Sequence, residues 1–323
     1  MLASSPWKTV WAMGSATHAD WTLARHSRTI PFLAKHAAIL IVLCIVQGQS
    51  AVITPVDPVR LFNGTNFSGL HTWLRDTGRE DPHRVFRITN GLLWITGERL
   101  GYIATEQEYT NYQLTVEFKW GSRVAPSRAG KARDSGMFLH ATGPDGNSHD
   151  GNGAFMAAIE CNLFQGATGD LLLIRGNDAN GKLIAPRIAA FVSDERDADG
   201  WRWCRFSGRS ETIQRWGRLN WTDKSPDWRD ELDFRGPRDA ERPYGEWNEV
   251  TCLCDGTTLR IKVNGQLVNM ARDIWPNSGK ILLQSEGSEI FFRKFELRPV
   301  TPDPRKGSLN PRPAGAASVK DNN

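Results

Sequence analysis

Short runs of alternating polar and apolar residues, separated by tight turns, recur along most of this chain and constrain its fold more than any other feature. The clearest run, Leu259–Val263, is followed by Asn264-Gly265 and then by a second run of the same kind. Asn-Gly between two such runs is the strongest local signal of a β-hairpin. Asn90-Gly91 and Asp255-Gly256 are further turn signals of this type.

The remaining pattern is also that of short strands, because several segments are rich in β-branched and aromatic residues and none has a long 3.6-residue period. The predicted strands are residues 84–89, 92–96, 112–120, 136–141, 157–164, 250–254, 258–263, 280–285 and 289–298. Many short strands without alternating helices indicate an all-β fold, an antiparallel β-sandwich, rather than a parallel βαβ fold.

The two ends of the chain differ from the rest. Residues 1–51 contain basic residues, then the apolar run 37–46, then small and polar residues, which is typical of a signal peptide. The run is too short for a spanning helix, which needs ~20 apolar residues. A buried strand or a membrane anchor is the alternative interpretation. Residues 301–323, rich in Pro, Gly, Ala and Asn, are expected to be a disordered tail.

We therefore expect one sandwich domain over residues 52–300, interrupted by an irregular excursion at about 195–243 that is rich in tryptophan and charge. Removing the leader lowers the net charge from +4 to +1, which leaves no basic surplus for a nucleic-acid partner. The mature chain would be exported, to the periplasm or outside the cell, with no stable membrane span. Export permits disulfides, but the pairing among Cys161, Cys204, Cys252 and Cys254 stays open. Cys252 and Cys254 should share one strand face and are poor partners for each other.

An ordered set of motifs extends over nearly all of the mature chain, from about Val59 to Val300. It comprises LFNGTNFSGL (61–70), the segment 90–120, KARDSGMFLHATG (131–143), AAIECNLFQGATGDLLLI (157–174), GEWNEV (245–250), VNGQLVN (263–269) and GKILLQSEGSEIFFRKFEL (279–297). This set resembles the 3-keto-disaccharide hydrolase family. The chain departs from the usual family pattern at Asn162, where Gln is common, and at Asp134, where Asn is frequent.

The resemblance implies a jelly roll of the concanavalin A-like lectin/glucanase type and an exported bacterial protein that acts on sugars. It also implies a pathway partner, an oxidoreductase that first oxidises a glycoside at C3. The substrate would then be an oligosaccharide or glycoside carrying a 3-keto sugar.

Candidate site residues follow from the strand faces, since side chains of a strand alternate between the two faces of the sheet. A curved jelly roll can gather the polar faces in one groove. We expect the catalytic candidates Glu117, His140 and Glu160 to converge there with Asn162, Gln284 and Glu286. Further substrate-binding candidates are Lys119, Arg133, Asp134, Trp203 and Trp221.

Each candidate also has a structural interpretation. Glu117 and Lys119 would form a solvated face with a cross-strand ion pair, and His140 would be a structural histidine. Asp134 would be a turn residue. Trp120 and Trp247 are expected in the core, whereas the tryptophans of the excursion are expected to contact sugar.

The predicted chemistry exploits the C3 carbonyl, which acidifies the hydrogen at C2. A base removes that proton, the group at C1 leaves by β-elimination, and water adds to the enone. This needs a base, an acid and a group that stabilises the enolate oxygen. Glu160 or His140 would be the base and the other the acid, and Lys119, Arg133, Asn162 or Gln284 would stabilise the oxyanion. No cofactor is certain; a divalent metal held by His140 and Glu160 is possible. The alternative function is a lectin-like carbohydrate-binding module without catalysis.

Overall fold

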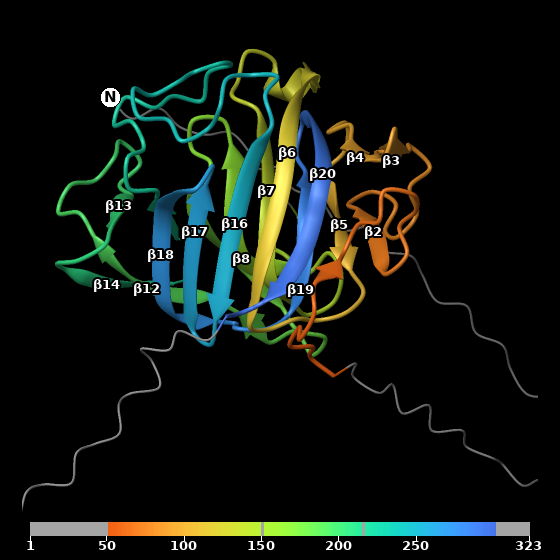
Figure 1. Ribbon diagram of the computed structural model, residues 1–323, viewed down its shortest axis with the longest axis horizontal. Helices are drawn as coiled ribbons and strands as arrows, with labels where there is room; N and C mark the ends of the chain where they lie inside the picture. Colours follow the sequence, from red (N-terminus) through yellow and green to blue (C-terminus); the bar gives the residue numbers. More distant parts are fainter. Residues whose placement is uncertain (1–50, 150–151, 215–216, 302–323) are drawn as a thin grey trace, which may run out of the picture. The chain divides into compact units, whose positions relative to one another are not determined.

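The computed structural model describes residues 51–149, 152–214 and 217–301 (Figure 1). The predicted leader and tail lie outside these residues, except for Ala51 and Thr301. The described residues form a mostly antiparallel β-sandwich, as predicted, and contain one short 3-10 helix, η1 (Pro126–Arg128), and no α-helix. No helix among them is long and apolar enough to cross a membrane.

The first sheet lies across the front of Figure 1. Its strands, in spatial order, are β3 (Phe86–Thr89), β4 (Leu92–Ile95), β20 (Ser288–Pro299), β6 (Tyr112–Val124), β16 (Asn248–Asp255), β17 (Thr258–Val263) and β18 (Gln266–Trp275). The short β1 (Val59–Arg60) also pairs with β20.

The second sheet packs behind the first. Its strands, in spatial order, are β2 (Leu70–Leu74), β5 (Gly101–Thr105), β19 (Lys280–Ser285), β7 (Asp134–Thr142), β8 (Ala157–Phe164), β9 (Leu171–Ile174), β15 (Arg218–Asn220) and β13 (Arg202–Arg205). β12 (Arg187–Val192) pairs with both β13 and β18 and so joins this end of the second sheet to the first. β14 (Ser210–Gln214) pairs with β12, and β10 (Gly176–Asn177) pairs with β11 (Leu183–Ile184).

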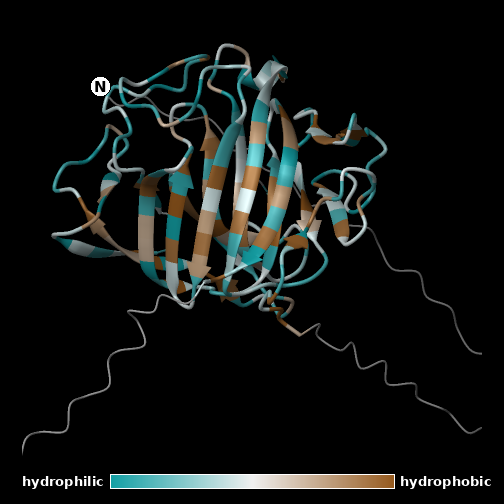
Figure 2. Ribbon diagram, viewed as in Figure 1, coloured by the Kyte–Doolittle hydropathy of each residue, from teal (hydrophilic) through white to brown (hydrophobic). Residues whose placement is uncertain are grey.

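The core lies between the two sheets and is made by the alternation that the sequence displays (Figure 2). Leu114, Val116 and Phe118 of β6 point inward and are fully buried, as are Ile159 and Cys161 of β8. Burying a side chain of this size contributes about 1.5–3 kcal/mol relative to leaving it exposed. The core therefore fixes the register of both sheets, and with it the residues that face outward.

The two Asn-Gly dipeptides form the predicted hairpin turns. Asn264 and Gly265 have φ of 49° and 85°, and Asn90 and Gly91 have 49° and 76°, so both residues of each turn adopt the left-handed region that a two-residue hairpin requires. The four cysteines of the described residues are free and buried. Cys252 and Cys254 share the core face of β16, as expected.

The predicted excursion is more regular than its sequence suggests, because β13, β14 and β15 form within it. Its anchor is Asp170, which is fully buried and accepts hydrogen bonds from Lys224 Nζ at 3.0 Å and from the Trp221 backbone N–H at 2.7 Å. Arg218 Nε lies 3.1 Å from the same carboxylate. These contacts hold the excursion where β15 pairs with β9.

Candidate active site

A pocket of about 200 Å³ lies on the outer face of the second sheet. The outward residues of β7 and β8 and the end of β19 form its floor, because Gly136 pairs with Asn162 and Phe138 with Glu160. Its lining residues are Asp134, Phe155, Glu160, Asn162, Phe164, Leu172, Ile174, Arg218, Gln284 and Glu286. The structure therefore brings together five of the residues predicted from sequence: Glu160, Asn162, Gln284, Glu286 and Asp134.

Gly136 is at the centre of this floor, and its lack of a side chain gives the neighbouring polar groups their room. A Cβ at this position would overlap the Glu160 carboxylate and lie 2.9 Å from Gln284 Oε1. The Glu160 and Gln284 side chains therefore converge over Gly136 from the strands on either side of β7.

Three carboxyl groups share the pocket, and each holds its proton more tightly than usual. Burial and the nearby Asp134 charge raise the pKa of Glu160 to about 8, although Arg218 opposes the shift. Burial and the charge of Glu160 raise the pKa of Glu286 to about 8. Burial and Glu286 likewise raise the pKa of Asp134, which forms an ion pair with Arg128 at 3.2 Å. Carboxyl groups coupled in this way lose their protons in steps that belong to the group of three rather than to one residue.

Two acceptor atoms in the pocket have no hydrogen-bond partner. They are Asn162 Oδ1 and Gln284 Oε1, both buried. Gln284 uses its amide nitrogen to donate to Glu286 Oε2 at 2.5 Å, which fixes the amide orientation. A buried acceptor without a partner costs about 1–3 kcal/mol, so hydroxyl groups of a bound ligand would stabilise both.

Arg218 is the cation of the pocket lining, and the sequence analysis did not select it. It lies in the excursion, and only the pairing of Arg218 with Leu172 brings it to the pocket. The available signal was its place among tryptophans that were expected to contact sugar, which is too weak to choose it over the other arginines of that segment.

His140 does not join Glu160, contrary to the prediction. The β7–β8 register shifts between Leu139 and Thr142, and His140 has φ of 55°, so a bulge rotates its side chain into the core. The ring contacts Tyr112 edge-on at 5.5 Å, and its Nδ1 lies 3.1 Å from the Pro276 carbonyl oxygen. Burial lowers the pKa of His140 to about 4.

The predicted metal ligands are therefore not brought to one place. Within the described residues, no group of three or more His, Cys, Asp or Glu side chains is arranged to hold a metal ion.

Glu117 and Lys119 also lie away from the pocket, because β6 belongs to the first sheet and both side chains point to its outer face. Glu117 forms ion pairs with Arg293 and Lys294. Burial alone would raise its pKa, but the hydrogen bonds from these two cations outweigh burial and lower it. These contacts agree with the structural interpretation of Glu117, a charged surface residue in a cross-strand ion pair.

Arg133 has a structural position. It is 4% exposed, its Nη1 lies 2.6 Å from Asp233 Oδ1, and its guanidinium stacks on the Tyr244 ring at 4.1 Å. It joins β7 to the excursion and does not line the pocket.

The predictions are wrong for two tryptophans that were expected to contact sugar and for one that was expected in the core. Trp203 and Trp221 are buried, and Trp203 Nε1 donates to the Lys224 carbonyl oxygen at 2.9 Å, so neither offers a ring to a sugar. Trp120 is in the core as expected. Trp247 is only partly buried, on the outer face of the first sheet.

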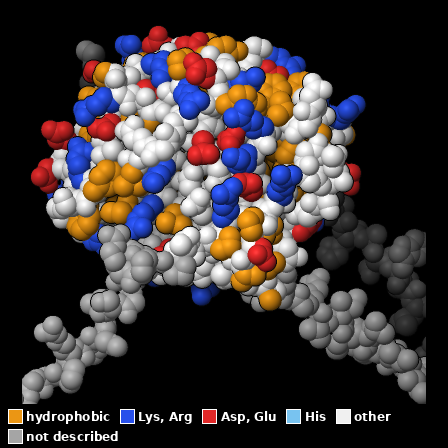
Figure 3. Space-filling view, in the orientation of Figure 1, with side chains coloured by type: hydrophobic (Ala, Val, Ile, Leu, Met, Phe, Trp, Pro, Cys, Tyr) orange, Lys and Arg blue, Asp and Glu red, His pale blue; other side chains and the backbone are white. Residues whose placement is uncertain are grey.

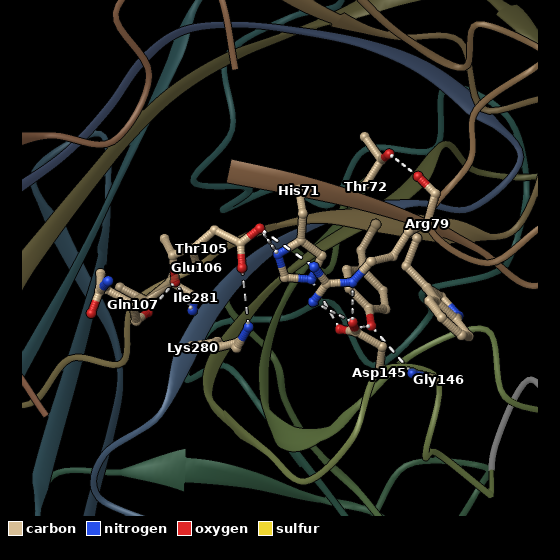
Figure 4. A network of polar contacts seen from close by, with 12 residues as sticks. His71, Thr72, Arg79, Thr105, Glu106, Gln107, Asp145, Gly146, Lys280 and Ile281 are labelled. Atoms are coloured by element: carbon tan, nitrogen blue, oxygen red, sulfur yellow. Dashed lines mark hydrogen bonds and ion pairs between the residues drawn. The ribbon is translucent and has the colours of Figure 1, made fainter. Parts of the chain in front are cut away.

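A second polar network, which the sequence analysis also missed, holds the loop after β7 (Figure 4). Asp145 accepts from Tyr102 Oη at 2.9 Å and from Arg79 Nε at 2.9 Å, and its Oδ1 lies 2.9 Å from His71 Nε2. The hydrogen bonds from these groups outweigh burial and lower the pKa of Asp145. The same loop carries Phe155 into the pocket wall, so this network supports the site from outside it.

A family model described as the 3-keto-alpha-glucoside-1,2-lyase-like domain matches residues 57–298, in agreement with the resemblance seen in the motifs. No curated protein matches the chain.

Similar solved structures include one from Parabacteroides distasonis, provisionally described as a glycosyl hydrolase. It is 15% identical with a TM-score of 0.41, and the alignment covers 75% of this chain and 93% of that one. The β-glucanase of Bacillus licheniformis is 13% identical with a TM-score of 0.38, covering 74% and 96%. The carbohydrate-binding module CBM66 of Bacillus subtilis is 9% identical with a TM-score of 0.37, covering 71% and 94%. At these scores the similarity carries no conclusion about activity.

Proposed function

This chain belongs to the 3-keto-alpha-glucoside-1,2-lyase-like family of carbohydrate-active proteins, and from this premise we propose that it cleaves 3-keto-glycosides by elimination and rehydration. The observation that carries the proposal is the grouping of Glu160, Glu286 and Arg218 in one pocket, with two carboxyl groups of raised pKa beside one cation.

Glu160 is the proposed base. Its carboxylate takes the proton from C2, the C2–H electrons form the C1=C2 bond, and the C1–O bond to the leaving group breaks. Arg218 stabilises the negative charge that develops on the C3 oxygen. The neighbouring carboxyl Glu286, protonated near neutral pH, donates its proton to the departing oxygen.

Water then adds across C1=C2 of the enone, with OH at C1 and H at C2, and the 3-keto sugar is released. Glu160, now protonated, exchanges its proton with solvent and delivers a solvent-derived proton to C2, and ionised Glu286 takes the proton of the attacking water. The two carboxyl groups thus end in their starting states. This pairing replaces the predicted Glu160–His140 pair with two groups that share the pocket.

Asn162 and Gln284 position the sugar in this proposal. Their side-chain oxygens accept hydrogen bonds from ring hydroxyls. Two buried acceptors that otherwise have no partner are thereby satisfied, which stabilises the complex. Asn162 thus serves the pocket although its side chain is shorter than the Gln usual in the family pattern.

The substrate must come from a reaction that oxidises a sugar hydroxyl at C3 to a ketone, so we also propose an upstream sugar oxidoreductase as the pathway partner. The pattern of residues 1–51 supports export as part of the same proposal.

The test is to incubate the purified protein with a 3-keto-disaccharide and, separately, with the matching unoxidised disaccharide, in D₂O and with or without EDTA. We expect release of sugar from the keto substrate alone, with deuterium at C2 of the product. Cleavage of both sugars without deuterium at C2 would contradict elimination. Saturable binding without turnover of either sugar would favour the lectin-like module instead. Loss of activity in EDTA would add a metal to the site.

A further inference from the structure

Five side chains form a straight row across the outer face of the first sheet, on the opposite side of the sandwich from the pocket. Arg87 pairs with Trp94, Trp94 with Phe291, and Phe291 with Lys119. Trp247 extends the row, because the next residue, Asn248, pairs with Phe118. Five strands at about 4.8 Å spacing give the row a length of roughly 19 Å.

The rings of this aromatic–cationic row are held by stacking. Trp94 and Phe291 lie nearly parallel, with ring centroids 5.8 Å apart and an interplanar angle of 19°. The Arg87 guanidinium is 4.7 Å from the Trp94 ring centroid, and Lys119 Nζ is 5.2 Å from that of Trp247. Such contacts orient the rings and keep the cations at the surface.

The charge of the row is not neutralised by neighbouring acids. Among the described residues, neither Arg87 nor Lys119 forms an ion pair, whereas nearby Arg123 pairs with Glu289 at 2.7 Å. The row therefore presents two free positive charges separated by two stacked aromatic rings.

The surface beside the row is hollowed. An open groove of about 740 Å³ is lined by Trp94, Phe291, Lys119 and Tyr244, and Tyr244 is 46% exposed. Figure 3 displays this face, where hydrophobic and basic side chains lie side by side at the upper right, in the region of β4 and β20. A linear chain can lie along such a groove.

We propose that the aromatic–cationic row is a second glycan-binding site, which takes a linear polysaccharide bearing carboxylate groups. The stacked and cation-covered rings present their edges, against which the apolar faces of sugar rings would pack, and the spaced cations would meet the carboxylates. The proposal goes beyond the cleavage of 3-keto-glycosides: the row would hold the enzyme on an acidic glycan while the pocket on the other sheet remains open to small substrates.

The experiment measures binding of the full chain to polygalacturonate by isothermal titration, with a neutral β-glucan and polyglutamate as comparison ligands. We expect saturable binding to polygalacturonate, at least tenfold tighter than to either comparison ligand. Trp94→Ala and Arg87→Gln should each weaken it by at least fivefold. Lys262→Ala, an exposed cation on β17 away from the row, should leave it unchanged.

Arg87 is at the surface, so Arg87→Gln reports on binding even if Trp94→Ala proves unstable. Cleavage of the 3-keto-disaccharide should be the same in wild type and Arg87→Gln, which separates this site from the proposed activity. Absence of binding, equal binding to polyglutamate, or equal binding by wild type and Arg87→Gln would overturn the proposal.

Discussion

Gly136→Ala tests the geometry of the pocket without altering any ionisable group. The added methyl would overlap the Glu160 carboxylate and lie 2.9 Å from Gln284 Oε1. Contacts between heavy atoms are comfortable at about 3.5–4.0 Å, so both groups must move by roughly 1 Å. A misplacement of about 1 Å at a reacting group costs about 100-fold in rate. We therefore expect kcat on a 3-keto-disaccharide to fall about 100-fold.

The stability of the same variant should change much less. Replacing Gly by Ala restricts the unfolded chain and stabilises by about 0.4–1 kcal/mol, while crowding a packed site costs about 1–3 kcal/mol. The net loss should be about 0–2 kcal/mol, measured by urea unfolding. Ile159→Val is the matched control, since it faces the core next to Glu160 and costs about 0.5–1.5 kcal/mol. Full activity in a folded Gly136→Ala protein would refute the placement of Glu160 at the reacting centre.

Three further predictions concern charge. Asp134→Asn removes a negative charge next to Glu160 and should therefore lower the pKa of Glu160 from about 8. The acidic limb of the kcat/KM–pH profile should move to lower pH, and a limb that does not move would contradict the coupling of Glu160 to Asp134. Glu160 and Glu286 have pKa values raised from 4.5 to about 8, so the folded state holds more protons and the free energy of unfolding should fall between pH 4.5 and 8. Urea titrations should find a weaker fall in Glu286→Gln. Asp145→Asn should lose about 1.5–3 kcal/mol at pH 7, against less than about 0.5 kcal/mol for the exposed Asp76→Asn. Because the pKa of Asp145 is lowered from 3.8, this loss should persist as the pH falls to about 3.8 and shrink only below that pH. A loss that does not shrink below pH 3.8 would argue against the ion pairs of Asp145.

The β-sandwich could be predicted because its strands and turns are determined largely by residues that are neighbours in the sequence. Alternation in β6, β8 and β17 and the Asn-Gly turns specify strands, hairpins and the buried face of each strand. The strands missed by the sequence analysis include β2, β5 and β9, which are short and whose pairing depends on distant partners.

The site was predictable in part, for the same reason. Alternation correctly places Asp134, Glu160 and Gln284 on outward faces of strands that prove to be neighbours. It cannot tell which of the two sheets a strand joins, and Glu117 of β6 therefore lies on the first sheet, away from the pocket. It also assumes an unbroken period of two, and a single bulge next to His140 turns that side chain into the core.

The positions of the other mispredicted or missed residues depend on packing between segments that are far apart in the sequence. Trp203 and Trp221 lie in a segment whose sequence gives no period, and tertiary contacts bury them: Trp221 packs in the hydrophobic core, and Trp203 Nε1 donates to the Lys224 carbonyl oxygen. Arg218 reaches the pocket by pairing of the excursion with β9. The local sequence was too weak a guide to select either outcome.

The most direct test of the central claim compares Glu160→Gln with Glu117→Gln, the same change on the opposite sheet. Both are assayed for deuterium incorporation at C2 and for sugar release from a 3-keto-disaccharide in D₂O. Removing a general base costs roughly 10²- to 10⁴-fold, so Glu160→Gln should lose both reactions to that extent while Glu117→Gln retains them. Normal C2 exchange in a folded Glu160→Gln protein would contradict the account.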